Sequence, residues 1–445
     1  MSPPATSPIT DQEINRRAVE WHRRYRGKLQ VVSKVPVRNR HDFGIWYTPG
    51  VAAACRSIRE EPGQVFEQTN RGNLVAVVSD GSRVLGLGDI GPEAGLPVME
   101  GKALLFKCLG GVDAVPLCVR TRSEGELIRF VEQVEPSFGG INLEDIAQPK
   151  CFRVLDALRE SLSIPVWHDD QQGTATVVLA GLWNSLEVTG RSLAEARLAL
   201  VGAGAANVAT YRLLVAAGAT PSRIVACDTR GTLHCGRDDI ERQAETFPDK
   251  WRLCRESNGD GIRGSIAEAL EGADVCLAFS RNGPDVIRPE WISRMARDAI
   301  VFACANPVPE VWPDVARQAG ARVVATGRGD FPNQVNNSLA FPAIFRGALD
   351  VRARAITDGM ALAAAGELAQ AAKDRGISTE RIVPSMAEWE VYPRVAAAVA
   401  EQAIAEGVAS LHGTRAELEQ RAAQSIRHAR DTLTTLMDSG SIPSF

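Results

Sequence analysis

The sequence lacks the features that would assign it to several classes of protein. No apolar run approaches the ~18 residues that a membrane-spanning helix needs, and the N-terminus lacks the apolar segment of a signal peptide. A formal net charge of −4 gives no reason to expect a nucleic acid or an anionic membrane as a partner. The nine cysteines include no Cys-x-x-Cys pair, so we expect reduced thiols in a cytoplasmic protein rather than disulfides or zinc ligands.

Internal repeats and long low-complexity linkers are also absent. The 445 residues suffice for two or three domains. The first ten or so residues are rich in Pro, Ser and Thr and are expected to be disordered, and residues 11–30 are expected to form a polar, helical lead-in.

Four carboxylates stand at the ends of two predicted strands. One short strand ends in Glu144 and Asp145, and another ends in Asp169 and Asp170. Apolar residues at three- and four-residue spacing between them predict a helix, and a strand–helix–strand unit has parallel strands. The carboxylates would then meet at one sheet edge, where Mg²⁺ or Mn²⁺ would relieve their repulsion. Solvated strand-end turns are the alternative, because acidic residues are common there.

Three further features precede this stretch. Lys102 lies on a predicted helix over residues 97–109 among apolar neighbours, which would lower its pKa and suit a base, unless its head group reaches solvent. Tyr47 stands just before a Pro-Gly turn that leads into a predicted helix, so it is a candidate functional residue. The alternative is an aromatic residue of the core whose hydroxyl has a hydrogen-bond partner. The strand pattern of residues 73–79 and the return over residues 83–87 predict a β-hairpin.

The strongest local motif is a strand over residues 197–201, the glycine-rich segment 202–207, a helix and a second strand that ends in Asp228. This order is typical of dinucleotide-binding domains. The glycines permit a tight turn and bring a pyrophosphate to the helix N-terminus. Asn207 occupies the third glycine position, where we expect it to loosen the packing of helix on strand slightly.

The residues after this motif argue for both nicotinamide coenzymes. Asp228 stands where a ribose 2′-hydroxyl is bound, whereas Arg230 and Arg237 would suit a 2′-phosphate. Further apolar strands at residues 275–279, 299–303 and 322–325 continue a doubly wound sheet. Asn306, Asn336 and Asn337 follow these strands, where they could bind a carboxylate or a coenzyme amide, or only cap turns.

Taken together, these motifs resemble those of the malic enzymes in their short bacterial form. The resemblance runs in order from about residue 18 to residue 410. The segments that carry it are Tyr47–Gly50, Ser79–Asp89, Glu100–Lys107, Asn142–Asp145, His168–Thr174, the loop from Gly202, Ala305–Pro307 and Pro332–Asn337. The sequence departs from the family at Asn207, in a longer loop over residues 280–284, and at residues 387–390.

The resemblance implies oxidative decarboxylation of L-malate to pyruvate and CO₂ with NAD⁺ or NADP⁺ and a divalent metal. It implies Glu144, Asp145 and Asp170 as metal ligands, Lys102 as general base tuned by Asp169, Tyr47 as general acid, and Arg83, Asn306 and Asn336 as substrate-binding residues. For the coenzyme it implies Thr174, Gly202, Gly204, Ala205, Ala206, Asn207, Asp228, Arg230 and Asn306. A homodimer is also implied, and whether Tyr47 and Lys102 serve the same chain's site stays open.

We therefore expect an α/β protein with an N-terminal catalytic domain, a Rossmann-type doubly wound dinucleotide-binding domain and a helical C-terminus. The expected divisions are a disordered lead-in at 1–17, the catalytic domain at 18–165, the nucleotide-binding domain at 166–410 and a helical extension at 411–445. Two alternatives stay open. One is a related enzyme that acts on another 2-hydroxy acid or gives lactate without free NADH, and the other is a catalytically silent nucleotide-binding regulator.

Overall fold

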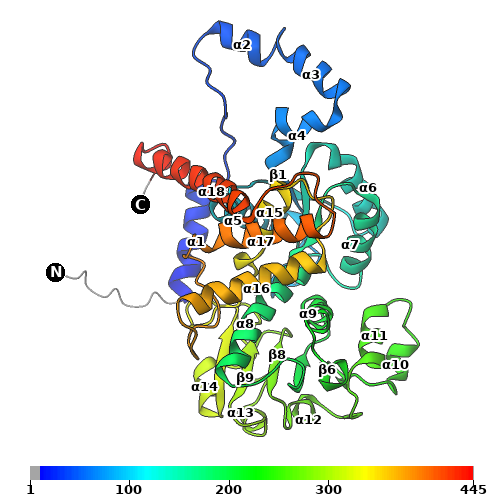
Figure 1. The fold of residues 1–445 in the computed structure, drawn as a ribbon. Coiled ribbons are helices and arrows are strands. Elements are labelled where there is room, and N and C mark those ends of the chain that lie inside the picture. The colour runs from blue at the N-terminus through cyan, green and yellow to red at the C-terminus, as the bar shows by residue number, and fades with distance from the viewer. Residues whose placement is uncertain (1–10, 444–445) are drawn as a thin grey trace, which may run out of the picture.

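Figure 1 shows the fold of the chain as a computed structural model, which describes residues 11–443. The chain forms two separate β-sheets, one in the upper and one in the lower part of the view, and helices surround both. The expected disorder of the first ten residues falls outside the described part, and the predicted helical lead-in is helix α1 (Asp11–Tyr25). No helix between residues 11 and 443 has the length and apolar composition needed to cross a bilayer.

The first sheet has four parallel strands in the order β2-β1-β3-β4. The strands are β1 (Leu74–Ser79), β2 (Asp113–Cys118), β3 (Gly140–Leu143) and β4 (Val166–His168). They are connected by α5 (Pro92–Gly110), α6 (Glu124–Val134) and α7 (Lys150–Ser161). The parallel unit β3–α7–β4 is confirmed, and the pairing of Leu143 with His168 sets the two strand ends side by side.

The predicted β-hairpin after β1 is wrong. Both edges of β1 are already occupied by the parallel strands β2 and β3, so a returning strand has no edge to pair with. Residues 80–91 instead form a compact glycine-rich loop with one antiparallel bridge, between Val84 and Gly88. This loop lies at the carboxyl end of the sheet, beside the carboxylates that follow β3, because Arg83 N–H donates to the Asp145 carbonyl at 3.0 Å.

The second sheet has six strands in the order β10-β9-β8-β5-β6-β7, of which only β7 is antiparallel. The strands are β5 (Leu198–Val201), β6 (Ile224–Asp228), β7 (Gly231–Thr232), β8 (Val275–Ala278), β9 (Ala299–Ala303) and β10 (Ala321–Thr326). The helices around them are α9 (Ala205–Ala216), α10 (Asp238–Glu241), α11 (Pro248–Glu256), α12 (Ile266–Leu270), α13 (Pro289–Ile292) and α14 (Pro313–Gln318). The strand order reverses between β5 and β8, which is where such sheets bind nucleotides.

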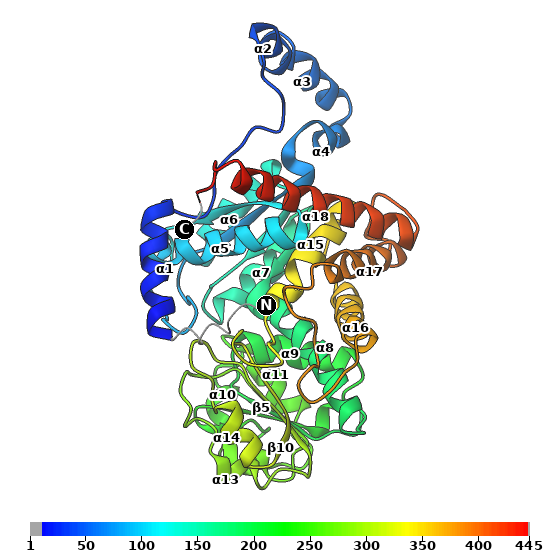
Figure 2. The same cartoon turned by 90° about the vertical axis from the view of Figure 1, so that its left-hand side faces the viewer.

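The C-terminal helices return to the first sheet. Helix α8 (Thr174–Val188) leads into the second sheet, and α15 (Phe341–Asp350), α16 (Asp358–Asp374), α17 (Val391–Ala405) and α18 (Arg415–Asp438) follow it. Figure 2 shows α15 and α18 beside α5, which they contact. The rings of Phe341 and Phe345 pack edge-on against Phe106 of α5, with centroids 4.6 and 5.2 Å away.

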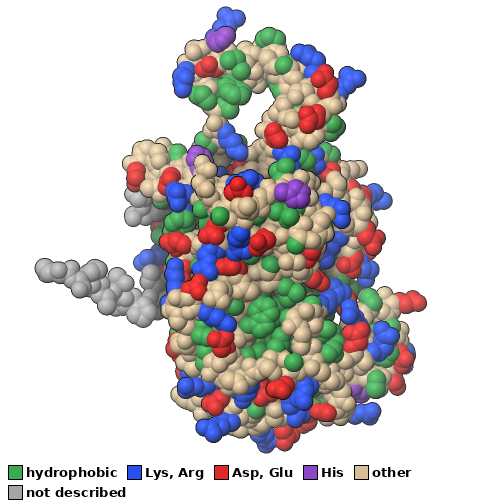
Figure 3. All heavy atoms as spheres, in the orientation of Figure 1, with side chains coloured by type: hydrophobic (Ala, Val, Ile, Leu, Met, Phe, Trp, Pro, Cys, Tyr) green, Lys and Arg blue, Asp and Glu red, His purple; other side chains and the backbone are tan. Residues whose placement is uncertain are grey.

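A segment of helices α2 (Arg40–Trp46), α3 (Val51–Glu60) and α4 (Val65–Gln68) projects from the body, and we call it the arm. None of its helices has a buried residue. Apolar side chains at its surface include Phe43, Ile45 and Trp46, each about half exposed, and Figure 3 shows hydrophobic groups at the surface of the arm. An exposed apolar surface of this kind is typical of a binding interface.

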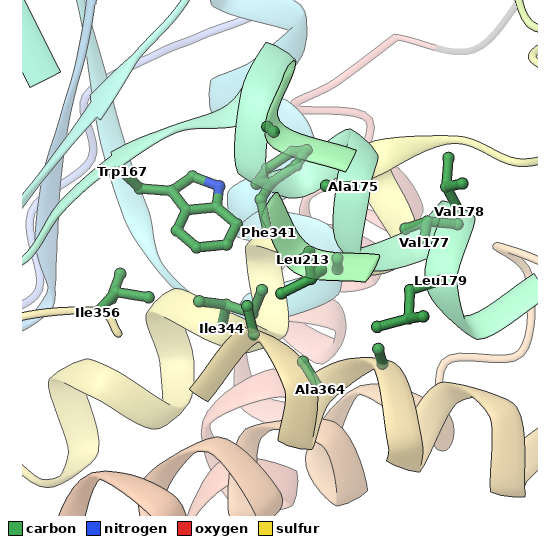
Figure 4. Packing of buried hydrophobic residues seen from close by; sticks show 14 of the residues in the cluster. Trp167, Ala175, Val177, Val178, Leu179, Leu213, Phe341, Ile344, Ile356 and Ala364 are labelled. Carbon is green, nitrogen blue, oxygen red and sulfur yellow. The ribbon is translucent and has the colours of Figure 1, made fainter. Parts of the chain in front are cut away.

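One continuous apolar core joins the two sheets. Figure 4 shows its central part, where Trp167 of β4 lies near Phe341 and Ile344 of α15, and Leu213 of α9 lies close by. The core therefore does not end at residue 165. The domain boundaries expected from the sequence stay predictions, because one cluster of buried residues has members on both sides of residue 165.

Asn207 ties helix to strand rather than loosening their packing. Its side chain is fully buried, and its amide donates to the carbonyls of Val201 at 3.0 Å and Gly202 at 2.8 Å. The expected loosening is therefore wrong, because the longer side chain reaches back to the end of β5 and bonds it. Thr210, one turn further along α9, is equally buried, but its hydroxyl has no partner among the described residues.

We expect Asn207→Ala to lower the free energy of unfolding by about 1–2 kcal/mol, because the Gly202 carbonyl loses its donor. Thr210→Val is the matched control on the same helix and should be neutral or stabilising, since it replaces a buried, unpaired hydroxyl with a methyl group. Urea unfolding of both variants measures the difference. A loss for Thr210→Val equal to that of Asn207→Ala would contradict this account.

Candidate active site

Three carboxylates meet at the carboxyl ends of β3 and β4. One oxygen from each of Glu144, Asp145 and Asp170 lies within 4.8 Å of the other two. Glu144 and Asp145 are buried, while Asp170 is partly open to solvent. The main-chain N–H of Asp145 donates to Asp170 Oδ2 at 2.8 Å, which fixes the two strand ends to each other. The meeting of these side chains at one edge agrees with the sequence prediction.

Burial and mutual repulsion disfavour the charged forms of these carboxyl groups. Burial raises the pKa of Glu144 well above its usual range, and burial together with Asp170 raises the pKa of Asp145 to about 8. Asp145 Oδ2 is buried with no hydrogen-bond partner among the described residues. Asp145 also has a left-handed backbone, with φ of 53°, a strained conformation that is common at functional sites. An oxygen-only donor set with one unpartnered oxygen fits a hard divalent cation such as Mg²⁺ or Mn²⁺.

Lys102 of α5 reaches the same cluster. Its Nζ lies 2.5 Å from Asp169 Oδ2 and 3.0 Å from Glu144 Oε1, and 4.8 Å from the centre of the Phe341 ring. The head group is buried, so the alternative of a lysine reaching solvent is excluded. The predicted lowering of its pKa is wrong. Burial does act to lower the pKa of Lys102, but Asp169, Glu144 and Asp170 outweigh it and raise the pKa.

Asp169 is held in place by its own turn. Residues Asp169–Gly173 form a π-helical turn, η4, and such turns are frequent at functional sites. Trp167 Nε1 donates to Asp169 Oδ1 at 3.3 Å, and the N–H of Thr174 donates to the Asp169 carbonyl. A Cβ at Gly173 would overlap Asp169 Oδ1, so the glycine makes room for this carboxylate. Burial raises the pKa of Asp169, and Lys102 opposes that shift.

The three predicted substrate-binding residues make different contacts in the structure. Arg83 joins it through its main chain, and its side chain is exposed. Asn336 caps the short helix η6 (Asn337–Leu339) with its side-chain oxygen, which accepts from Ser338 N–H at 2.9 Å, so the turn-capping alternative holds for that oxygen. Asn306 follows β9 and approaches Gly86, in the loop after β1.

Tyr47 is not brought to the cluster within one chain. It ends helix α2 on the arm, and its residue surface is 70% exposed. Figures 1 and 2 show the arm pointing away from the sheets. The alternative of a core aromatic is excluded by this exposure.

The glycine-rich loop lies at the point where the second sheet reverses its strand order. Gly202 has a positive φ of 101°, and a Cβ there would stand 2.5 Å from the Phe279 carbonyl, so only glycine fits. Gly204 is the N-cap of α9, and Ala205 and Ala206 form its first turn. The N-terminus of α9 therefore faces the crevice with its free N–H groups, which suits a pyrophosphate.

Asp228 at the end of β6 is surrounded by cations. Arg237 donates to both of its oxygens at 3.1 and 2.9 Å, Lys250 Nζ lies 2.5 Å away, and the N–H of Arg230 donates at 2.8 Å. These donors lower the pKa of Asp228 against the opposing effect of burial. Lys250 was missed by the sequence reasoning, because it lies on α11 and no periodic pattern links it to Asp228.

Two other buried polar residues were also missed. Asn142 on β3 donates from Nδ2 to Glu144 Oε2 at 3.0 Å and so orients that carboxylate. Glu310 accepts hydrogen bonds from two loops of the second sheet. Asn142 could have been noticed as a polar residue inside an apolar strand, and Glu310 by its place just after Asn306-Pro307.

Comparisons with known proteins agree with this geometry. Residues 26–159 match the malic enzyme N-terminal domain, and residues 171–404 match the malic enzyme NAD binding domain. The bifunctional malic/malolactic enzyme of Bacillus subtilis is 45% identical over 402 residues, which cover 89% of this chain and 95% of that protein. The NAD-dependent malic enzyme of Geobacillus stearothermophilus is 47% identical over 86% of this chain and 78% of its own length.

Solved structures give the same result. The malic enzyme of Entamoeba histolytica superposes with a TM-score of 0.95 at 47% identity, over 100% of this chain and 93% of that one. The malic enzyme of Pyrococcus horikoshii gives 0.89 at 50% identity, over 95% and 98% of the two chains. The resemblance and the α/β fold predicted from the sequence are thereby confirmed, and the chain belongs to the malic enzyme family.

Proposed function

We propose that this chain oxidises and decarboxylates L-malate to pyruvate and CO₂ with NAD⁺ or NADP⁺, and that Glu144, Asp145 and Asp170 bind Mg²⁺ or Mn²⁺. The observation that carries the proposal is Lys102, whose buried amine lies 3.0 Å from Glu144 in the carboxylate cluster. A base and a metal site are two of the parts that this reaction needs, beside a coenzyme and a general acid. A bound divalent cation would stabilise the negative charge that develops on the C2 oxygen as CO₂ leaves.

Lys102 serves as the base once it has lost its proton. Asp169 Oδ2 lies 2.5 Å from Nζ and orients the amine, while Asp169, Glu144 and Asp170 raise the pKa of Lys102 and so oppose the loss of its proton. The neutral amine would then take the hydroxyl proton of malate, and a bound nicotinamide coenzyme would supply the acceptor for the hydride of C2. Loss of CO₂ gives an enolate, and Tyr47 adds a proton at C3 as general acid. Arg83, Asn306 and Asn336 hold the substrate carboxylates.

Tyr47 acts on the site of a second copy of the chain in a homodimer. Its own carboxylate cluster is out of reach, and the arm exposes Phe43, Ile45 and Trp46 around it. A second copy seated on the arm would bury these side chains and receive Tyr47. In a two-fold symmetric dimer the exchange is reciprocal, so each site combines Lys102 of one copy with Tyr47 of the other.

The surroundings of Asp228 support acceptance of both coenzymes. Arg237 and Lys250 neutralise its carboxylate, so its repulsion of a 2′-phosphate is weak. The guanidinium of Arg230 is largely exposed and can turn toward such a phosphate. Thr174, Gly202, Gly204, Ala205, Ala206, Asn207 and Asn306 complete the coenzyme site, with Asn207 acting through its hold on the loop rather than by contact.

One relative favours a second candidate activity. The Bacillus subtilis protein is named a bifunctional malic/malolactic enzyme. By analogy, pyruvate that stays bound beside the reduced coenzyme could be reduced to lactate, with no free NADH formed. An assay of this chain therefore has to measure lactate as well as pyruvate.

The purified chain with L-malate and Mn²⁺ should reduce NAD⁺ and NADP⁺, tested separately, with matching pyruvate. Lys102→Met should lower kcat by about 10²–10⁴-fold, the usual contribution of a general base. Lys107→Met on the same helix is the control, because Lys107 pairs with Asp113 away from the cluster. Reduction of neither coenzyme, with no lactate formed, would rule out the proposal, and lactate without free reduced coenzyme would favour the second candidate.

Mn²⁺ should raise the melting temperature of the wild-type chain, because it binds the folded cluster alone. The expected gain in the free energy of unfolding is about 2.7 kcal/mol when Mn²⁺ is at a hundredfold excess over its Kd. Asp170→Asn should abolish the gain by removing one ligand charge. Asp260→Asn, an exposed carboxylate on the second sheet's domain, should leave it intact. Calorimetric scans with and without Mn²⁺ test this, and an unchanged gain in Asp170→Asn would exclude it as a ligand.

Mixed dimers test the exchange of Tyr47 between copies. Lys102→Met and Tyr47→Phe should each be nearly inactive alone. After joint refolding, half of the dimers are mixed and each has one intact site, so about a quarter of wild-type activity should return. No recovery, with mixed dimers verified by two affinity tags, would show that Tyr47 acts within its own chain, and full activity of Tyr47→Phe alone would exclude it as the general acid.

A further inference from the structure

Glu310 is a buried carboxylate that the proposed reaction does not use. It is 0% exposed, and a charge in that position needs hydrogen-bond donors around it. Oε1 accepts from Ser280 N–H at 2.7 Å and from Ser280 Oγ at 3.1 Å, and Oε2 accepts from Ala305 N–H at 2.9 Å. Both oxygens of the carboxylate are therefore engaged, each with a different loop.

These donors stand at the start of two loops that leave neighbouring parallel strands. Ser280 opens the loop after β8, and Ala305 precedes Asn306 in the loop after β9. The Glu310 carbonyl also accepts from Ile287 N–H at 3.1 Å, which fixes the far end of the first loop. One residue thus ties both ends of the segment 280–287 to the segment that carries Asn306.

The two loops meet the catalytic part of the chain at Gly86. A Cβ at Gly86 would overlap the side-chain amide of Asn282 and would stand 2.5 Å from the Asn306 carbonyl. On its other side, the Asn306 amide packs on Gly327, where a Cβ would be 2.6 Å from Nδ2. Asn306 is therefore seated between two glycine backbones, and a small displacement of its loop breaks both contacts.

From Gly86 the contact continues to the carboxylate cluster. Arg83 N–H donates to the Asp145 carbonyl at 3.0 Å, and Leu85 N–H donates to Asp145 Oδ1 at 3.3 Å. Glu310 is thus linked through Asn306, Gly86 and Leu85 to one of the carboxylates that would bind the metal. The links are hydrogen bonds at Ala305 and Leu85, a close approach of Asn306 to Gly86, and the peptide bonds that join Ala305 to Asn306 and Leu85 to Gly86.

We propose that Glu310 is a positioning residue that holds the 280–287 and Asn306 loops closed against Gly86, and so sets the nicotinamide end of the coenzyme site relative to the carboxylate cluster. This role rests on the function proposed above for the assignment of the cleft to malate and coenzyme. It does not require Glu310 to touch either molecule.

Glu310→Gln is the sharpest variant, because it is isosteric but can accept on only one side. Its NH₂ group must face the N–H of either Ser280 or Ala305, so one loop is released. The kcat/KM for malate should fall about ten- to hundredfold, as expected for a displacement of reacting groups by an ångström or less. NADH should bind about tenfold more weakly, while ADP-ribose, which lacks the nicotinamide, should bind as to wild type.

Gly86→Ala tests the same contact from the other side, since its methyl group pushes against the Asn306 carbonyl. This variant should also bind NADH more weakly while its affinity for ADP-ribose stays that of the wild type. Gly125→Ala is the matched control, because no atom lies within 4 Å of a Cβ at that position. Fluorescence titration with each ligand gives the two affinities, and thermal unfolding confirms that each variant is folded.

Wild-type affinities in Glu310→Gln would overturn the inference, as would equal weakening of NADH and ADP-ribose, which indicates a general loss of structure. Neither titration depends on turnover of malate. If the wild-type chain failed to oxidise malate while Glu310→Gln still weakened NADH alone, the proposed function would fall and the positioning of the nicotinamide end by Glu310 would stand.

Discussion

The site depends on how several like charges are buried at one sheet edge. Glu144, Asp145 and Asp169 follow two adjacent strands, and the parallel register places their carboxylates together. Repulsion and burial would protonate them in the absence of a positive charge. Lys102 supplies one such charge from α5, which is why a helix from an earlier part of the chain must pack on this edge. The aromatic contacts of Phe106 with Phe341 and Phe345 hold that helix in place.

Local chemistry in the sequence was enough to predict much of this site. Parallel strands put their carboxyl ends on one edge, so the grouping of the carboxylates follows from the order of strand, helix and strand alone. The glycine-rich loop and the acid at the end of β6 were equally clear, because strand, turn, helix and strand follow each other directly. Predictions of this kind succeed where the chain itself brings the residues together.

Apart from Asn207, whose partners lie five and six residues away, the errors share one physical cause, which is contact between distant segments. Lys102 has apolar neighbours in sequence, but its partners Glu144 and Asp169 arrive from later strands and reverse the direction of its pKa shift. The hairpin after β1 failed because β2 and β3 occupy both of its edges. Lys250 beside Asp228 and Glu310 beside Ser280 left no periodic signal, since each pairing joins residues that are more than twenty positions apart in the sequence.

The placement of Tyr47 has a consequence for the proposed enzyme. In the proposed mechanism, a general acid on an exposed arm leaves each isolated copy without one group of its site, whereas the proposed base and metal ligands lie within one chain. Binding of malate and coenzyme then needs only the single copy, but protonation of the enolate needs two. Under this proposal, catalysis is linked to protein concentration through the dimer equilibrium, as for any property that only the assembled state has. The apolar side chains around Tyr47 would set the affinity of the dimer, because their burial supplies the free energy of association.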